Sequence, residues 1–172
     1  MKEKHNIVML DFDGVMNNQL YYEKNHEKIN ERMRDESDKF SYLRTQIDPN
    51  AVEVLNNFIE ETNAKIVISS TWRKAEAFQS MDNIADFFKD VGIKGECIGV
   101  TPIFDSRHTV RGNEIHSWLQ KNKEIVKNYV IFDDDGDMLL WQKNHYFRVD
   151  GYIGLTSTVT YRAARFLNGE II

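Results

Sequence analysis

A short apolar run that ends in two carboxylates constrains this chain more than any other stretch. Residues 7–10 read Ile-Val-Met-Leu, a run rich in β-branched and large apolar types that is typical of a buried strand. Asp11, Asp13 and Gly14 follow within four positions. Open α/β sheets bind ligands beyond the carboxyl ends of their strands, so both carboxylates are expected at a functional edge. Two negative charges so close together repel each other, and a bound cation is the usual relief.

Four further apolar runs predict four more strands, at residues 64–68, 96–100, 129–132 and 146–149. Between these runs, apolar residues recur at helical spacing, which predicts a helix in each connection. One helix has a clear start at Asp48-Pro49, because an N-cap residue is followed by proline at the first helical position. Strands that alternate with helices indicate parallel βαβ units. We therefore expect an α/β, Rossmann-like three-layer fold with a central parallel sheet of about five strands.

Residues 17–47, which follow the first strand directly, differ in character from the rest of the chain. They are rich in charge, and their apolar residues fall near one helical face, which suggests one or two amphipathic helices. These apolar residues are Ile29, Met33, Phe40, Leu43 and Ile47. Two interpretations stay open: a solvated helical insertion, or a small cap or flap over the carboxylates. With 172 residues and 41% hydrophobic content, we expect a single domain over 1–172 that carries this insertion.

Composition narrows the classes of function. The net charge of −5 offers no global basic field for extended nucleic-acid binding. The single cysteine, Cys97, cannot form an internal disulfide, and we expect it to be a buried small apolar residue in a strand. The sequence shows neither a signal peptide before the first strand nor an apolar run long enough to span a bilayer, so a cytoplasmic protein without a membrane partner is expected.

Three predicted strands end in residues that carry chemistry: D-F-D-G at 11–14, S-S-T at 69–71 and D-D-D-G-D at 133–137. Parallel strands bring such ends to one edge of the sheet. In this combination the chain resembles the haloacid dehalogenase-like (HAD) superfamily of phosphohydrolases, from Ile7 to about Leu167. S-S-T-W-R, R-G-N-E-I-H-S-W-L and G-L-T are similar to a compact branch that includes HAD domains linked to RNA repair and polynucleotide phosphatases.

The resemblance implies roles for both opening carboxylates. Asp11 would be the nucleophile that attacks phosphorus and gives an aspartyl-phosphate. Asp13 would protonate the leaving oxygen and then activate water. The loop is expected to break the strand just after Asp11, and Gly14 makes this break possible.

The same resemblance implies groups that bind the phosphoryl oxygens. Ser69 would donate a hydrogen bond to one of them, with Ser70 as a close rival, while helix capping is the structural alternative for this cluster. Arg111 would supply the positive charge, where many family members use lysine. Lys94 is the runner-up for that role, and a plain surface arginine is the structural alternative.

The acidic run at the end of the fourth strand would complete a magnesium site. The resemblance implies Asp133 and Asp134 as ligands together with Asp11 and the backbone carbonyl of Asp13, and Mg²⁺ prefers such oxygen ligands. Asp137 is the alternative metal ligand, because its D-x-x-x-D spacing from Asp133 also matches the family pattern. The sequence does not show which of these acids bind the metal.

Trp72 and Arg73 follow the serines and could contact a substrate, because an aromatic ring beside a guanidinium suits a base and a phosphate. Core packing for the tryptophan and a salt bridge for the arginine are the alternatives. The expected function is a magnesium-dependent phosphohydrolase acting through an aspartyl-phosphate on a phosphorylated substrate. The substrate could be a nucleotide or a polynucleotide 3′-phosphate end, and the alternatives are a sugar-phosphate phosphatase or a catalytically idle binding protein.

Overall fold

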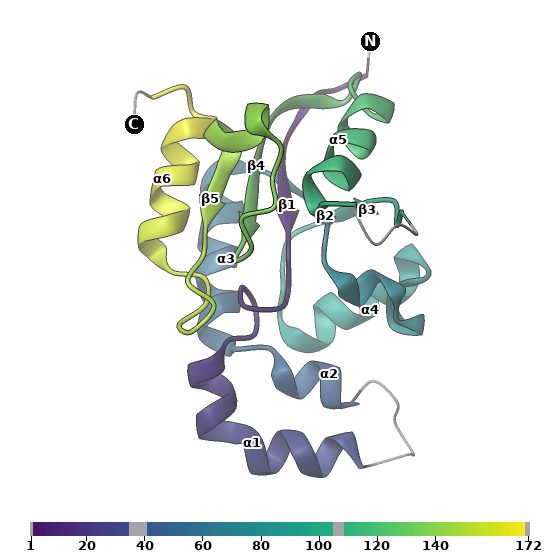
Figure 1. Ribbon diagram of the computed structural model, residues 1–172, viewed down its shortest axis with the longest axis vertical. Coiled ribbons are helices and arrows are strands. Elements are labelled where there is room, and N and C mark those ends of the chain that lie inside the picture. Colours follow the sequence, from purple (N-terminus) through teal and green to yellow (C-terminus); the bar gives the residue numbers. More distant parts are fainter. Residues whose placement is uncertain (1, 35–40, 105–108, 171–172) are drawn as a thin grey trace.

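The computed structural model describes residues 2–34, 41–104 and 109–170. Its centre is a sheet of five parallel strands in the order β3-β2-β1-β4-β5. The strands are β1 (His5–Leu10), β2 (Lys65–Ile68), β3 (Cys97–Val100), β4 (Val126–Asp133) and β5 (Tyr146–Arg148). Helices separate them along the chain (Figure 1), so the α/β fold with a parallel sheet of five strands is confirmed.

Both faces of the central strand β1 are buried, which explains its continuous apolar run. Val8 and Leu10 pack on the face covered by α3 (Pro49–Thr62), α4 (Met81–Val91) and α6 (Ser157–Leu167). Ile7 and Met9 pack on the opposite face, against α5 (Arg111–Lys121). The sheet is therefore the middle of three layers, and its two apolar clusters are separate.

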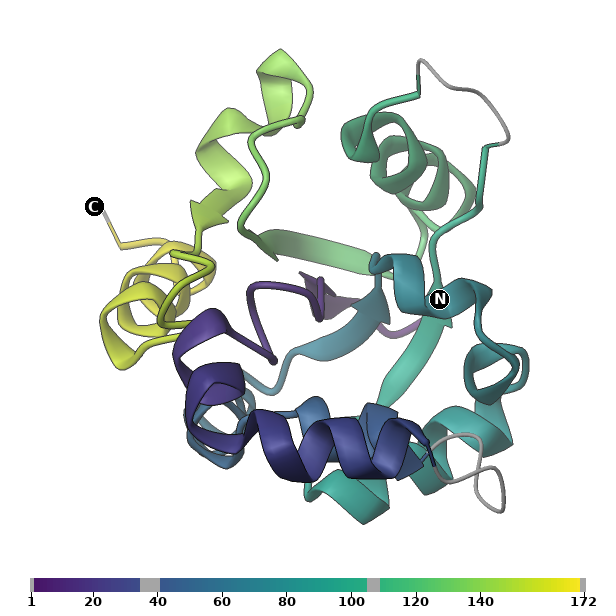
Figure 2. The same ribbon diagram turned by 60° about the horizontal axis from the view of Figure 1, so that its bottom comes forward.

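The two helices after β1 lie at the end of the molecule toward which the strands point (Figures 1 and 2). They are α1 (Gln19–Met33) and α2 (Ser41–Gln46). Of the residues expected on their apolar face, Ile29, Leu43 and Ile47 are buried. Met33 is 66% exposed, and Phe40 lies outside the described residues. Only part of the predicted apolar face therefore packs against the protein.

The two ends of this helical segment meet at its base. The backbone N–H of Asp48 donates to the carbonyl oxygen of Met16 at 2.8 Å. Nδ2 of Asn18, the N-cap of α1, donates to Oδ2 of Asp48, the N-cap of α3, at 2.8 Å. The predicted helix start at Asp48-Pro49 is thus confirmed, and its capping carboxylate also ties the segment to the core.

Among the described residues, no helix is long and apolar enough to cross a membrane. Cys97 lies in β3, as expected, where it is only half-buried.

Candidate active site

Strand β1 ends at Leu10, one residue before the break that was expected just after Asp11. The backbone N–H of Asp11 still donates to the carbonyl oxygen of Phe132 in β4 at 3.0 Å, and Asp11 is buried. Phe12 turns into the apolar core, whereas Asp13 is exposed. The two carboxylates thus sit in different environments, one in the sheet edge and one on the loop that follows.

Three carboxylates from two strand ends converge beside this loop. One oxygen from each of Asp11, Asp133 and Asp134 lies within 4.8 Å of the others. The parallel pairing of β1 with β4 causes this, because Leu10 and Phe132 are register partners and the acids directly follow both. The structure therefore brings together the three side chains that were expected to hold a metal.

Asp133 is the least compensated of the three acids. It is 1% exposed, and its Oδ2 has no hydrogen-bond partner among the described residues. Burial, and next the charge of Asp11, raises the pKa of Asp133 to about 8. A buried carboxylate pair of this kind is stabilised by a cation, and an all-oxygen donor set suits Mg²⁺. The residues present therefore fit a magnesium ion.

Gly14 leaves the space that Asp134 occupies. Its φ is +70°, and a Cβ added to it would lie 2.2 Å from Oδ2 of Asp134. Any larger residue would be strained in its backbone and would displace this carboxylate. The D-x-D-G motif thus needs its glycine for the second acidic strand end as well as for the turn.

Arg111 lies at the same edge because it is the first residue of α5. Its Nε is 3.7 Å from Oδ2 of Asp133, and its Nη1 is 3.4 Å from Oε2 of Glu114. Lys94 is exposed and precedes β3, which places it at the opposite edge of the sheet. The structure therefore brings Arg111, and not Lys94, to the carboxylates.

Asp137, the alternative metal ligand, has another partner. Its Oδ2 accepts a hydrogen bond from the backbone N–H of Arg111 at 2.8 Å. This contact caps the first turn of α5 and ties the acidic loop to the helix that carries the arginine. Asp137 is not in the cluster that Asp133 and Asp134 form with Asp11.

Both serines after β2 are fully buried beside Asp11. The Oγ of Ser69 has no hydrogen-bond partner within the described part of the chain. The hydroxyl of Ser70 has two partners, because it bonds to Asp11 and accepts the backbone N–H of Trp72 at 3.3 Å. Burial raises the pKa of Asp11, and this Ser70 hydrogen bond and the charge of Arg111 oppose the rise.

Trp72 lies in η1 (Thr71–Lys74), and its placement differs from the expected substrate contact. The ring is 8% exposed and stacks on Phe12 with centroids 5.1 Å apart. Phe78 and Phe87 approach it edge-on, so no face is left for a nucleotide base. Its indole Nε1 donates to Oδ1 of Asp13 at 2.9 Å. The expectation of a stacking platform is therefore corrected: core packing places this ring.

Arg73 is also directed into the protein rather than toward a substrate. It is 3% exposed, and its guanidinium donates to the carbonyl oxygens of Ser69, Ser70 and Thr101. Its Nη2 forms an ion pair with Glu114. The expectation that Arg73 contacts a substrate phosphate is corrected accordingly, because each nitrogen of its guanidinium group already has a protein partner.

Asn17 and Glu114 were not predicted as site residues, and Thr71 was predicted only as part of the S-S-T cluster, without a role of its own. Asn17 and Thr71 both contact Asp13, at 3.0 Å and 3.2 Å. Glu114 bridges two arginines. Of Asn17 and Glu114, only Glu114 left a signal, since it follows Arg111 by three positions on a predicted helix, a spacing at which side chains meet.

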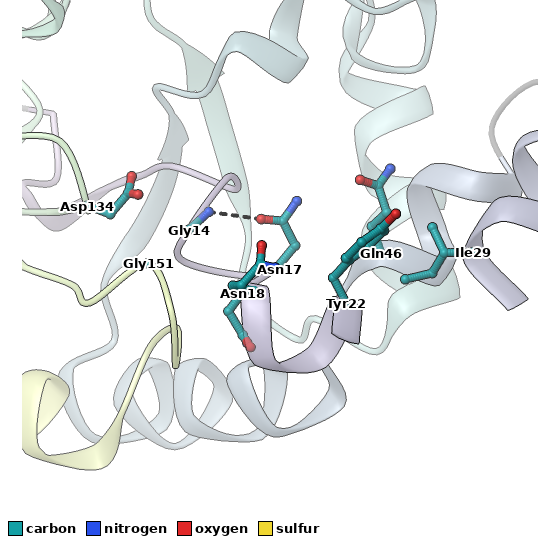
Figure 3. Close-up of a pocket in the computed structure, with 9 residues that line it drawn as sticks. Gly14, Asn17, Asn18, Tyr22, Ile29, Gln46, Asp134 and Gly151 are labelled. Carbon is teal, nitrogen blue, oxygen red and sulfur yellow. Dashed lines mark hydrogen bonds between the residues drawn. The ribbon is translucent and has the colours of Figure 1, made fainter. Parts of the chain in front are cut away.

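A cavity of about 310 Å³ opens between the active-site loop and the helices α1 and α2. Figure 3 shows Gly14 and Asp134 at one side of Asn17, and Tyr22, Gln46 and Ile29 at the other. The full lining is Gly14, Asn17, Asn18, Gln19, Tyr22, Ile29, Gln46, Asp134 and Gly151. The cavity thus lies between the cluster of Asp11, Asp133 and Asp134 and the helices α1 and α2.

The chain is similar to one known protein family and, at low sequence identity, to several solved structures. Residues 7–159 match the family described as the HAD domain in Swiss Army Knife RNA repair proteins. Similar solved structures include a haloacid dehalogenase-like family hydrolase from Streptococcus pneumoniae, with 11% identity and a TM-score of 0.44 over 95% of this chain and 92% of that one. Another is a beta-phosphoglucomutase from Clostridium difficile, with 17% identity and a TM-score of 0.41 over 95% and 89% of the two chains. No curated protein matches the chain significantly. Because the family match spans most of its length, the chain belongs to the HAD domains of Swiss Army Knife RNA repair proteins.

Proposed function

We propose that this protein is a magnesium-dependent phosphohydrolase that acts through an aspartyl-phosphate on Asp11. The observation that carries the proposal is the convergence of Asp11, Asp133 and Asp134 within 4.8 Å of one another. Arg111 lies beside the cluster, 3.7 Å from Asp133. Three acids and one guanidinium at the end of a parallel sheet suit a dianionic phosphate held with a divalent cation.

Asp11, Asp133 and Asp134 would hold the Mg²⁺, and the resemblance adds the backbone carbonyl of Asp13. When bound, the ion neutralises negative charge on the phosphoryl oxygens and on the carboxylates around them. Oδ2 of Asp133 supports this assignment, since it is buried, accepts no hydrogen bond within the described part of the chain, and has only the guanidinium of Arg111 near it, at 3.7 Å.

The side chains of the protein divide the remaining work. An oxygen of Asp11 forms the bond to phosphorus while the bond to the leaving oxygen breaks and Asp13 protonates that oxygen. Water then attacks the aspartyl-phosphate, Asp13 takes its proton, and Asp11 is released as a carboxylate. The buried hydroxyl of Ser69 donates to a phosphoryl oxygen, and Arg111 stabilises the charge of the transferring group.

The cavity beside α1 favours a nucleotide as the substrate. Its lining includes no Lys or Arg among the described residues, so it suits an uncharged part of a substrate and not a second phosphate. The ring of Tyr22 is 42% exposed, and the amide of Gln46 supplies both a donor and an acceptor, whereas the amides of Asn17 and Asn18 already bond within the protein. An aromatic ring with an amide suits a nucleoside next to the scissile phosphate. We propose a nucleotide or a polynucleotide 3′-phosphate end, which agrees with an acidic protein that contacts one terminus.

A phosphatase panel tests both parts of the proposal. The substrates are 3′- and 5′-phosphorylated oligonucleotides, nucleoside monophosphates, sugar phosphates and an aryl phosphate, each with Mg²⁺ and with chelator. Asp11→Asn is expected to lower turnover by several powers of ten, as loss of a nucleophile does. Asp86→Asn, an exposed acid on α4, is the matched control and should retain turnover. Native-like turnover by Asp11→Asn would exclude the aspartyl-phosphate mechanism.

The substrate preference has its own variant. Tyr22→Ala is expected to raise KM for the nucleotide substrate about tenfold, since stacking contributes about 1–3 kcal/mol, and to spare the aryl phosphate. Tyr161→Ala, exposed on α6, serves as the control. Faster hydrolysis of sugar phosphates than of nucleotides by the native protein would exclude the proposed nucleotide preference, while the proposed phosphatase activity would stand.

A further inference from the structure

We infer that Trp72 is a positioning residue that determines which oxygen of Asp13 carries the proton for the leaving group, an inference that rests on the function proposed above. Nε1 of Trp72 donates to Oδ1 of Asp13 at 2.9 Å. Nδ2 of Asn17 donates to the same oxygen at 3.0 Å. The other oxygen, Oδ2, lies 3.2 Å from the hydroxyl of Thr71. The carboxyl group is therefore held from both sides although Asp13 is exposed.

The chemistry of these donors decides where the proton sits. An indole N–H and an amide NH₂ only donate, whereas a hydroxyl both donates and accepts. A proton on Oδ1 of Asp13 would face two further hydrogens, so neutral Asp13 carries its proton on Oδ2. The Thr71 hydroxyl can donate to Oδ2 in the carboxylate and accept from it in the acid.

A second contact of Asn17 determines the orientation of its amide. Its Oδ1 accepts the backbone N–H of Gly14 at 2.9 Å, so Nδ2 must be the atom that faces Asp13. The turn after Asp11, through the backbone N–H of Gly14, thereby determines that the Asn17 amide donates to Asp13 and does not accept from it.

Trp72 provides the rigid part of the arrangement. Its ring stacks on Phe12 at an angle of 12° between the planes, and its backbone N–H donates to Oγ of Ser70. Phe12 lies between the nucleophile and the acid in the sequence. The ring therefore packs against the loop whose carboxyl group it binds, and it cannot shift without moving that loop.

The position of the proton matters in both half-reactions. As Asp11 bonds to phosphorus and the leaving oxygen departs, the proton on Oδ2 of Asp13 passes to that oxygen. In the second half, water gives a proton to Oδ2 as its oxygen bonds to phosphorus and the bond from Asp11 breaks. Both aspartates end as they began, and the products are an alcohol and phosphate.

Trp72→Phe tests the inference, because it keeps an aromatic ring and removes the N–H. The two substrates are p-nitrophenyl phosphate, whose leaving group needs little protonation, and the alkyl phosphate that the native protein hydrolyses best. On the alkyl phosphate we expect kcat to fall about 10- to 100-fold with KM unchanged, part of the 10²–10⁴-fold effect typical of general acid catalysis. On p-nitrophenyl phosphate the fall should be less than about threefold, since proton donation contributes little there.

Trp118→Phe is the matched control, because Trp118 is 7% exposed and packs in the cluster on the other face of the sheet. It should leave the ratio of the two rates unchanged. In an Asp13→Asn background, Trp72→Phe should add no further loss, as expected for residues that act as a unit.

Equal losses on both substrates, or a change confined to KM, would overturn the inference. If the native protein is active, Asp13→Asn has much lower turnover and Trp72→Phe behaves as native, the inference fails while the proposed function stands. A native protein that hydrolyses neither substrate removes the proposed function itself.

If Trp72→Phe does not fold, the indole N–H resonances of the three tryptophans provide the measurement in protein with the native ring. Asp13→Ala should shift the resonance of Trp72 and leave those of Trp118 and Trp141 in place. A Trp72 resonance that does not move would overturn the inference.

Discussion

Arg73 and Glu114 form an ion pair in the interior of the site, with side chains that are 1% and 10% exposed. Oε2 of Glu114 also accepts from Nη1 of Arg111 at 3.4 Å. One carboxylate thus serves two guanidinium groups, that of Arg73 in the interior and that of Arg111 beside the acidic cluster. Burial lowers the pKa of Arg73, and the charge of Glu114 opposes that effect.

Glu114→Gln is expected to lower the free energy of unfolding by about 3–5 kcal/mol, because it leaves a buried guanidinium without its counter-charge. Urea denaturation measures the change. Glu96→Gln is the control: Glu96 is 65% exposed and bonds Lys65 at 2.7 Å, and surface pairs contribute about 0–1 kcal/mol. Equal effects of the two variants would show that the interior pair has no special role.

Arg111→Ala is expected to lower kcat about 10²–10³-fold, the usual loss when a group that stabilises transition-state charge is removed. The concentration of Mg²⁺ needed for half-maximal rate should stay near its native value. Lys94→Ala, at the opposite edge of the sheet, should have native kinetics. The reverse pattern would transfer the basic role to Lys94.

The pKa of Asp133, raised to about 8, gives the metal-free protein a predictable dependence on pH. The folded state binds this proton more tightly than the unfolded state, so this contribution to stability is present at low pH and is lost as pH rises toward 8. Tm should therefore rise when chelator-treated protein is taken from pH 8 to pH 6. Added Mg²⁺ should stabilise more at pH 8, where the carboxylate is available.

Asp133→Asn should abolish both the pH effect and the stabilisation by Mg²⁺ when Tm is measured under the same conditions. Asp134→Asn should mainly weaken the activation by Mg²⁺. If both variants keep a native curve of rate against Mg²⁺ concentration, the metal binds elsewhere.

Gly14→Ala is expected to raise the Mg²⁺ concentration for half-maximal rate, because the new Cβ would lie 2.2 Å from Oδ2 of Asp134. Gly169→Ala is a close control: its φ is +78°, against +70° at Gly14, and no atom lies within 4 Å of the added Cβ. Both variants carry a backbone cost of about 1–2 kcal/mol. A normal Mg²⁺ response in Gly14→Ala would show that Asp134 needs no such space.

Cys97 should react slowly with iodoacetamide at pH 8 in the native protein. Burial raises the pKa of its thiol to about 11, so little of the reactive thiolate is present. Alkylation followed by mass spectrometry should show fast labelling only in denaturant. Rapid labelling of native protein would place the thiol in a more polar environment than the half-buried strand β3.

The sequence by itself determined the elements and the opening acids. The apolar runs have the length and composition of strands buried on both faces, and chemistry at their ends follows from parallel topology. β1 with Asp11, and β4 with Asp133, could therefore be read without a structure. These are local properties of the chain together with a general rule about sheets.

Only the tertiary structure decided the placement of Trp72, Arg73 and Arg111. A residue just after a strand can face the site or the core, and the partners that settle the question are distant in sequence: Phe12 for Trp72, and Glu114 for Arg73. Strand direction places the start of α5, and thus Arg111, at the edge of the sheet that carries the acidic cluster, and Lys94 at the opposite edge. Long-range packing sets these choices because the local sequence leaves each of them nearly equal in energy.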